Sequence, residues 1–237
     1  MHQTNLINET LGNLFRLVFP VYCQSCGSNL HAGEDTLCSH CEYQLPVTSF
    51  HLENDNPVEA IFWGRIELHA AASFLYYQKG EMVQHLIHLL KYHSKPEIGI
   101  YLGKLFGQYL MQSQRFADVR YIIPVPLHWK KKKKRGYNQS EKIVDGLVTS
   151  MEAEKDIKSL IRKVHTSTQT KKSRYERWEN VSSIFEISSQ ARQLENQHVL
   201  LVDDVITTGS TIEACFSTLH EIPAIKISVV SLACPLI

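Results

Sequence analysis

The sequence has 237 residues, of which 43% are hydrophobic and 21% are charged, and its formal net charge is +1. This composition is that of a soluble globular protein, and the length accommodates one large α/β domain or an ordinary domain plus a small one. No apolar run approaches the roughly eighteen residues that cross a bilayer, and no secretory signal opens the chain, so we expect a cytoplasmic protein without a membrane span.

The first expected element is a short amphipathic helix. Its apolar face consists of Leu11, Leu14, Phe15 and Val18. Proline disfavours helical backbone in the residue before it, so this helix should end at or before Pro20.

Two CxxC pairs follow. Cys23 and Cys26 form the first pair, and Cys38 and Cys41 form the second, eleven residues further on. Each pair suits a tight turn, and four thiolates complete a zinc tetrahedron without an open position for water. We therefore expect a structural Zn²⁺ site, with Gly27 in a left-handed turn position. Four free thiols, or a redox pair, are the alternatives.

Residues 45–57 are polar and contain two prolines, which is typical of a linker. We therefore place the N-terminal helix and a zinc-ribbon module at residues 1–50. A larger α/β domain is expected at residues 58–237.

The middle of the chain alternates between strand-like and helical patterns. The expected elements are one or two strands near a sheet edge at 66–77, helices at 82–93 and 100–112, and a buried strand at 121–128 that enters a proline-stiffened loop.

A run of lysines follows that loop. Residues 130–134 are all lysine and precede Arg135, after which Asn138 or Ser140 can cap another helix. Such a run raises the local positive potential. It could bind nucleic-acid phosphates, attract a small anion, or simply lie in solvent.

Residues 162–181 form a second basic cluster. The segment lacks helical periodicity and lies between strand-like residues 159–161 and 184–185. A long basic loop between strands is typical of a lid, and positive charge suits a lid over a pyrophosphate group.

The strongest pattern in the chain spans residues 199–211. Four apolar residues predict a strand buried on both faces, Asp203 and Asp204 end it, and an amphipathic helix follows. The turn between them contains Thr207, Thr208, Gly209, Ser210 and Thr211. Backbone N–H groups at a helix N-terminus and nearby hydroxyls bind phosphate, whereas the acids suit ribose hydroxyls or a metal ion. The alternative is an ordinary strand-to-helix turn.

This stretch resembles the signature of type I phosphoribosyltransferases, which bind phosphoribosyl pyrophosphate (PRPP). The acidic pair and residues 207–211 match that pattern position by position. The resemblance implies a parallel sheet flanked by helices, with the acids on the ribose and the turn on the 5-phosphate. It also implies Mg²⁺ bound together with PRPP.

The chain is more narrowly similar to the ComF family of bacterial competence proteins. The similarity rests on the doubled CxxC, residues 124–128 and 135–139, and the spacing of residues such as Arg174 and Arg177. Val164 and Lys172 depart from the arginine and leucine usual in that family's lid.

The family resemblance suggests further site residues and partners. It implies that Lys91 contacts pyrophosphate and that Arg135 and Arg177 bind substrate. It also implies a link to natural transformation, with single-stranded DNA and competence or recombination proteins as possible partners.

Two main hypotheses follow, and the sequence leaves both open. The chain could be a phosphoribosyltransferase that transfers phosphoribosyl to an unknown nitrogen acceptor. Alternatively, it could be a non-catalytic module that responds to PRPP while it binds single-stranded DNA or docks onto a partner protein.

Overall fold

The computed structural model describes residues 20–163 and 184–235. The expected helix at Leu11–Val18 lies outside them, as does most of the expected lid. The chain divides into two compact units, Met1–Pro46 and Val47–Ile237. Within the described residues, no helix combines the length and apolar character needed to cross a membrane.

The first unit is held together by turns and a short helix. Tyr22 pairs with Asn29 in an antiparallel bridge, and between them Gly27 adopts a φ of 75°, as the CxxC turn predicts. Helix α2 (Ser39–Tyr43) begins directly after Cys38. Among residues 20–46, few large apolar side chains are buried, which limits the stability that this part of the unit can draw from apolar burial.

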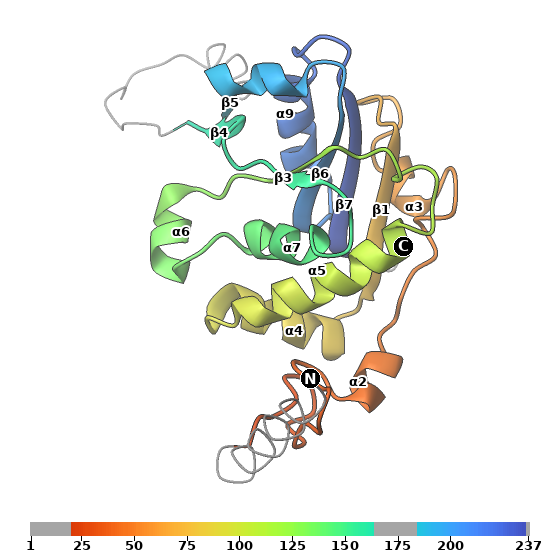
Figure 1. The fold of residues 1–237 in the computed structure, drawn as a ribbon, viewed down its shortest axis with the longest axis vertical. Helices are drawn as coiled ribbons and strands as arrows, with labels where there is room; N and C mark the ends of the chain where they lie inside the picture. Colours follow the sequence, from red (N-terminus) through yellow and green to blue (C-terminus); the bar gives the residue numbers. More distant parts are fainter. Residues whose placement is uncertain (1–19, 164–183, 236–237) are drawn as a thin grey trace, which may run out of the picture. The chain divides into compact units, whose positions relative to one another are not determined.

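The second unit is built on a five-stranded, fully parallel sheet with the order β1-β7-β6-β2-β3 (Figure 1). This confirms the predicted α/β fold. Its strands are β1 (Ala70–Tyr77), β2 (Tyr121–Pro124), β3 (Glu154–Lys155), β6 (His198–Val205) and β7 (Lys226–Pro235).

Strand β1 lies at a sheet edge, as predicted, whereas the C-terminal strand β7 lies inside the sheet between β1 and β6. Residues 199–202 of β6 are completely buried, which explains their continuous apolar run.

Helices cover both faces of the sheet. The helices described in this unit are α3 (Pro57–Ala60), α4 (Met82–Tyr92), α5 (Pro96–Leu110), α6 (Trp129–Arg135), α7 (Gln139–Leu147) and α9 (Ser210–Leu219). The connections from β1 to β2 and from β2 to β3 run across the sheet in one direction, and the connection from β6 to β7 runs in the other. Because such crossovers are right-handed, α4, α5 and α7 lie on one face and α9 lies on the other. Helix α5 begins four residues earlier than expected, with Pro96 in its first turn.

The segment predicted as a linker is packed against the sheet from Val47 onward. Val47 bridges Leu75 of β1, and Asn56 is buried. The Asn56 side chain caps α3 and donates to the carbonyl of Ala71 at 2.8 Å. Polar residues in this segment therefore serve as buried hydrogen-bonding groups, which a composition-based linker prediction misses.

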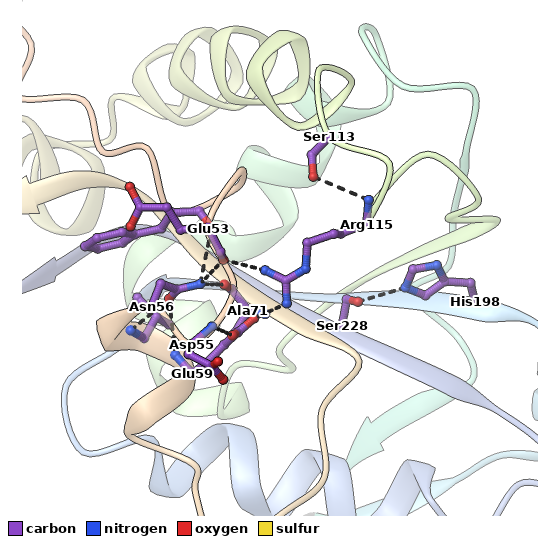
Figure 2. Close-up of polar contacts among 11 residues, drawn as sticks. Glu53, Asp55, Asn56, Glu59, Ala71, Ser113, Arg115, His198 and Ser228 are labelled. Atoms are coloured by element: carbon purple, nitrogen blue, oxygen red, sulfur yellow. Dashed lines mark hydrogen bonds and ion pairs between the residues drawn. The ribbon is translucent and has the colours of Figure 1, made fainter.

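Arg115 joins this segment to the loop after α5 (Figure 2). Its guanidinium donates to the Glu53 carbonyl at 2.6 Å and pairs with Glu59. Glu59 in turn accepts from the backbone N–H of Asp55 at 2.7 Å and of Ala71 at 3.0 Å. These contacts fix residues 53–59 against the start of β1.

The expected lid is flanked by a small hairpin-like pair. Strand β4 (Leu160–Arg162) pairs antiparallel with β5 (Phe185–Ile187), followed by a 3-10 helix, η2 (Ser189–Leu194). The strand-like character predicted on both sides of the lid is confirmed. The intervening residues 164–183 lie outside the described chain.

Candidate functional site

The acidic pair lies at the carboxyl end of β6, where parallel sheets commonly bind ligands. Asp203 Oδ1 accepts hydrogen bonds from the Asp204 N–H at 2.8 Å and from the Ser140 hydroxyl at 3.2 Å. Burial, together with the neighbouring Asp204 carboxylate, raises the pKa of Asp203 to about 7. An additional cation or hydroxyl donor beside these two carboxylates is therefore favourable.

Lys91 meets this pair from the last turn of α4. Its Nζ lies 2.7 Å from Asp204 Oδ1. The Tyr137 hydroxyl donates to the Leu90 carbonyl and so fixes the end of the helix that carries Lys91. The other oxygen of Asp204, Oδ2, is buried and has no hydrogen-bond partner. The structure thus places Lys91 beside an acidic pair that lies more than a hundred positions further along the chain.

Residues 207–211, called the phosphate loop from here on, connect β6 to α9. The four hydroxyl-bearing residues are exposed, whereas Gly209 is buried and has a φ of 75°. A hollow of ≈ 40 Å³ is lined by Asp203 and residues 205–212. Backbone N–H groups at the start of the ten-residue helix α9 adjoin this hollow. Such an arrangement favours an anion with several oxygen acceptors.

Arg65 supports the phosphate loop through contacts with the loop and with α9, a role that was not predicted from the sequence. It donates to the Thr208 carbonyl at 2.8 Å and pairs with Glu213 in the first turn of α9. Phe62 and Ile61, from the same segment as Arg65, pack closely on Gly209. No local pattern marks Arg65, because its partners lie more than 140 positions away in the chain.

The structure describes one of the two arginines that are predicted to bind substrate. Arg135 ends α6, pairs with Gln139, and lies 5.8 Å from the ring centre of Tyr92. Arg177 lies outside the described residues. Asn138 caps α7 by accepting from the Ser140 N–H at 3.2 Å, which selects it over Ser140 as the capping residue.

The lysine run is helical rather than part of a loop. His128 caps α6 by accepting from the Lys130 N–H at 3.2 Å, and Gly136 ends the helix in a left-handed conformation. Lysine has good helix propensity, so a capped run of five can form two turns despite its charge. All five lysines are exposed.

The four predicted zinc ligands converge in the first unit. Their sulfur atoms all lie within 4.8 Å of one another, and the Cys26 and Cys38 sulfurs are 3.8 Å apart. Tetrahedral zinc–sulfur bonds of about 2.3 Å require sulfur–sulfur edges of about 3.8 Å. The Cys38 N–H also donates to Cys23 Sγ at 3.3 Å. The cluster is therefore compatible with a structural zinc site.

A Ser–His–Asp arrangement occurs at the opposite, amino end of β6 and β7. His198 bonds to the Ser228 hydroxyl at 2.8 Å (Figure 2). Its other ring nitrogen lies 2.6 Å from an Asp118 carboxylate oxygen. Ser228 is completely buried, and no substrate can reach its hydroxyl. Burial lowers the pKa of His198 to about 4, so its ring is neutral at neutral pH. We interpret this group as a structural network in the sheet.

A larger cleft of ≈ 840 Å³ runs along residues 62–69. Two of its basic residues, Arg65 and Arg115, already pair with Glu213 and Glu59. None of the predicted site residues lines it. The convergent polar groups therefore favour the carboxyl end of β6 as the functional site, even though the hollow there is smaller.

Comparisons with known proteins agree with this site. The family described as "Phosphoribosyl transferase domain" matches residues 113–234, which include the acidic pair and the phosphate loop. The chain is 27% identical to competence protein F of Haemophilus influenzae over 228 residues, covering 91% of this chain and 97% of the relative. It is 28% identical to the DNA utilization protein YhgH of Shigella flexneri over 194 residues, covering 80% of each.

Among solved structures, an allosteric regulatory enzyme of purine biosynthesis matches 60% of this chain with a TM-score of 0.43 and 18% identity. The match spans only 29% of that structure's chain. Matches to competence protein F and YhgH confirm the predicted resemblance to the ComF family. The chain therefore belongs to the phosphoribosyl transferase domain family, with competence protein F and YhgH among its relatives.

Proposed function

We propose that this protein binds PRPP at the carboxyl end of β6. One observation carries the proposal: an acidic pair leads directly into a hydroxyl-rich loop whose hollow lies at the N-terminus of α9. The phosphate loop would hold the 5-phosphate through backbone N–H groups and hydroxyls. Asp203 and Asp204 would accept hydrogen bonds from the ribose hydroxyls.

The pyrophosphate end of PRPP would lie toward Lys91. Its ammonium group supplies the positive charge that such a leaving group requires. The carboxylate oxygens of the acidic pair, including the unpartnered Oδ2 of Asp204, also fit a site for hydrated Mg²⁺. Bound with PRPP, Mg²⁺ would neutralise part of the pyrophosphate charge. The roles of Arg135 and Arg177 in substrate binding are part of the same proposal.

The reaction open to such a site is displacement at the anomeric carbon. A nitrogen nucleophile would form the new C–N bond, while the C–O bond breaks and pyrophosphate leaves with the electron pair. The protein would mainly hold the ribose and stabilise charge on the leaving group. We assign no general base among the described residues. Release of pyrophosphate on addition of one acceptor would establish catalysis.

The names of the relatives suggest the setting of this chemistry. Competence protein F and the DNA utilization protein YhgH point to a role in DNA uptake or use. We propose the same role here, in the cytoplasm and together with competence or recombination proteins. The six cysteines in the chain are all unpaired, which suits a reducing compartment.

Thermal unfolding tests the PRPP proposal directly. Ligand at a hundredfold excess over its Kd stabilises the folded protein by about 2.7 kcal/mol, which raises the Tm by about 5 to 10 °C. We expect this shift with PRPP and Mg²⁺, and no shift with ribose, which lacks both phosphate groups. An unchanged Tm at millimolar PRPP would contradict the proposal.

Helix α6 favours a second function, binding of single-stranded DNA. Its five exposed lysines adjoin exposed aromatic rings: Lys130 Nζ lies 5.6 Å from the ring centre of Trp129, and Tyr92 lies beside Arg135. Single-stranded nucleic acids bind surfaces that combine cations for phosphates with aromatic rings for base stacking.

The salt dependence of the affinity for single-stranded DNA distinguishes lysines that contact DNA phosphates from lysines that stay in solvent. Replacing Lys131, Lys133 and Lys134 with glutamine should reduce the slope of log affinity against log salt by about 2, because each single-strand contact contributes about 0.7. The control replaces three exposed lysines elsewhere, Lys79, Lys104 and Lys158, and removes the same charge. Equal slopes in the two variants would rule out α6 as the contact surface.

A further inference from the structure

The ion pair between Lys91 and Asp204 limits access to the acidic pair. Lys91 Nζ contacts Asp204 Oδ1 at 2.7 Å, and their side chains are 22% and 7% exposed. Asp204 Oδ2 is buried and accepts no hydrogen bond. Oδ1 is thus occupied by Lys91, Oδ2 is buried, and Asp204 does not line the hollow beside the phosphate loop. A ribose hydroxyl can reach Asp204 only if its carboxylate rotates, which opens the contact with Lys91.

Opening this contact requires a new partner for each charge. Asp204 is almost fully buried, so its carboxylate needs a hydrogen-bond donor or cation in place of Lys91. Lys91 needs an anion for the same reason. The helix that carries Lys91 cannot simply move away, because Leu86 and Leu90 are completely buried and Tyr137 holds the Leu90 carbonyl. The movement must therefore come from the two side chains, Lys91 and Asp204, and not from the helix.

Fragments of PRPP satisfy only half of this requirement. Ribose 5-phosphate offers hydroxyls to Asp204 but no anion to Lys91. Pyrophosphate offers an anion to Lys91 but no hydroxyls to Asp204. Only a ligand that carries both groups replaces both halves of the ion pair at once.

We propose that the Lys91–Asp204 ion pair is a selectivity latch, which makes the site favour a ribose that bears both a 5-phosphate and a pyrophosphate. The inference rests on the proposed PRPP site and adds a role for Lys91 beyond contact with the leaving group. Lys91 also disfavours the binding of sugar phosphates that lack pyrophosphate, because these ligands offer no anion that replaces Asp204 as the partner of Lys91. The latch thus separates PRPP from the ribose 5-phosphate that shares most of its structure.

Calorimetry with ribose 5-phosphate and with PRPP, each with Mg²⁺, tests the latch in the full chain. In Lys91→Met, affinity for ribose 5-phosphate should rise about tenfold, because Asp204 is no longer occupied, while affinity for PRPP should fall about tenfold. A simple pyrophosphate contact predicts only the second change. Lys91→Gln provides the same test with a polar side chain if the methionine variant folds poorly.

Lys95→Met is the matched control. Lys95 lies four positions after Lys91 and pairs with Glu97 at 3.6 Å, away from the acidic pair. Its affinities for both ligands should stay within about twofold of the parent. If the parent binds PRPP but ribose 5-phosphate binds no better to either Lys91 variant, the latch is wrong and the PRPP site stands. If the parent does not bind PRPP, the proposed function itself fails.

Discussion

Replacing Gly209 with alanine should lower the free energy of unfolding by about 2 to 5 kcal/mol and weaken PRPP binding roughly a hundredfold. Gly209 has a φ of 75°, where an L-residue is strained. An alanine Cβ would also lie 2.6 Å from Phe62 Cε1 and 3.0 Å from Ile61 Cγ2. Relief of that overlap must shift either the phosphate loop or the segment that supports it.

Gly136→Ala is a matched control for this change. Gly136 has a φ of 88°, but a Cβ there would meet no atom within 4 Å. It therefore carries the same kind of backbone strain, about 1 to 2 kcal/mol, without the steric overlap. Denaturant unfolding and PRPP titration of both variants separate the two effects. Equal losses in the two variants would mean that packing against Phe62 does not position the phosphate loop.

Loss of the metal should unfold the first unit. Structural zinc contributes on the order of 10 kcal/mol to the folding of small zinc peptides, and residues 20–46 bury few large apolar side chains. In Cys38→Ser, or after chelation, we expect zinc content to fall and amide protection to disappear between residues 20 and 46. Sheet amides such as those of β6 should keep their protection.

Hydrogen exchange and metal analysis on the full chain measure both effects. Tyr43→Ser is the control, since Tyr43 is 91% exposed in the same unit and contributes little to its core. It should bind zinc like the parent. Full protection of residues 20–46 in metal-free Cys38→Ser protein would show that the four cysteines do not hold a structural metal.

Local sequence patterns predicted much of the fold and part of the site. Residues 199–211 specify strand, acidic pair, loop and helix within one continuous segment, so periodicity and turn chemistry were sufficient there. The doubled CxxC likewise contains all four converging ligands in a short span. The predicted edge strand and the strands that flank the lid rest on the same kind of local signal.

Features that depend on distant contacts could not be predicted in this way. Arg65 supports the phosphate loop, and Arg115 clamps residues 53–59, but the residues that they hold there lie more than fifty positions away in the chain. The helix at the lysine run was not predicted, because the cap that His128 provides at its start was overlooked. The resemblance selected Lys91, and only the structure shows that it contacts Asp204.

The central claim is that the acidic pair and the phosphate loop bind PRPP, and calorimetry with PRPP and Mg²⁺ tests it most directly. The parent should bind saturably, and Asp203→Asn/Asp204→Asn should bind about a hundredfold more weakly, because hydrogen bonds to charged groups contribute about 1.5 kcal/mol or more each. The charge-matched control, Asp35→Asn/Asp55→Asn, changes two exposed carboxylates and should bind like the parent. Absence of binding by the parent, or equal affinity in all three proteins, would contradict the account.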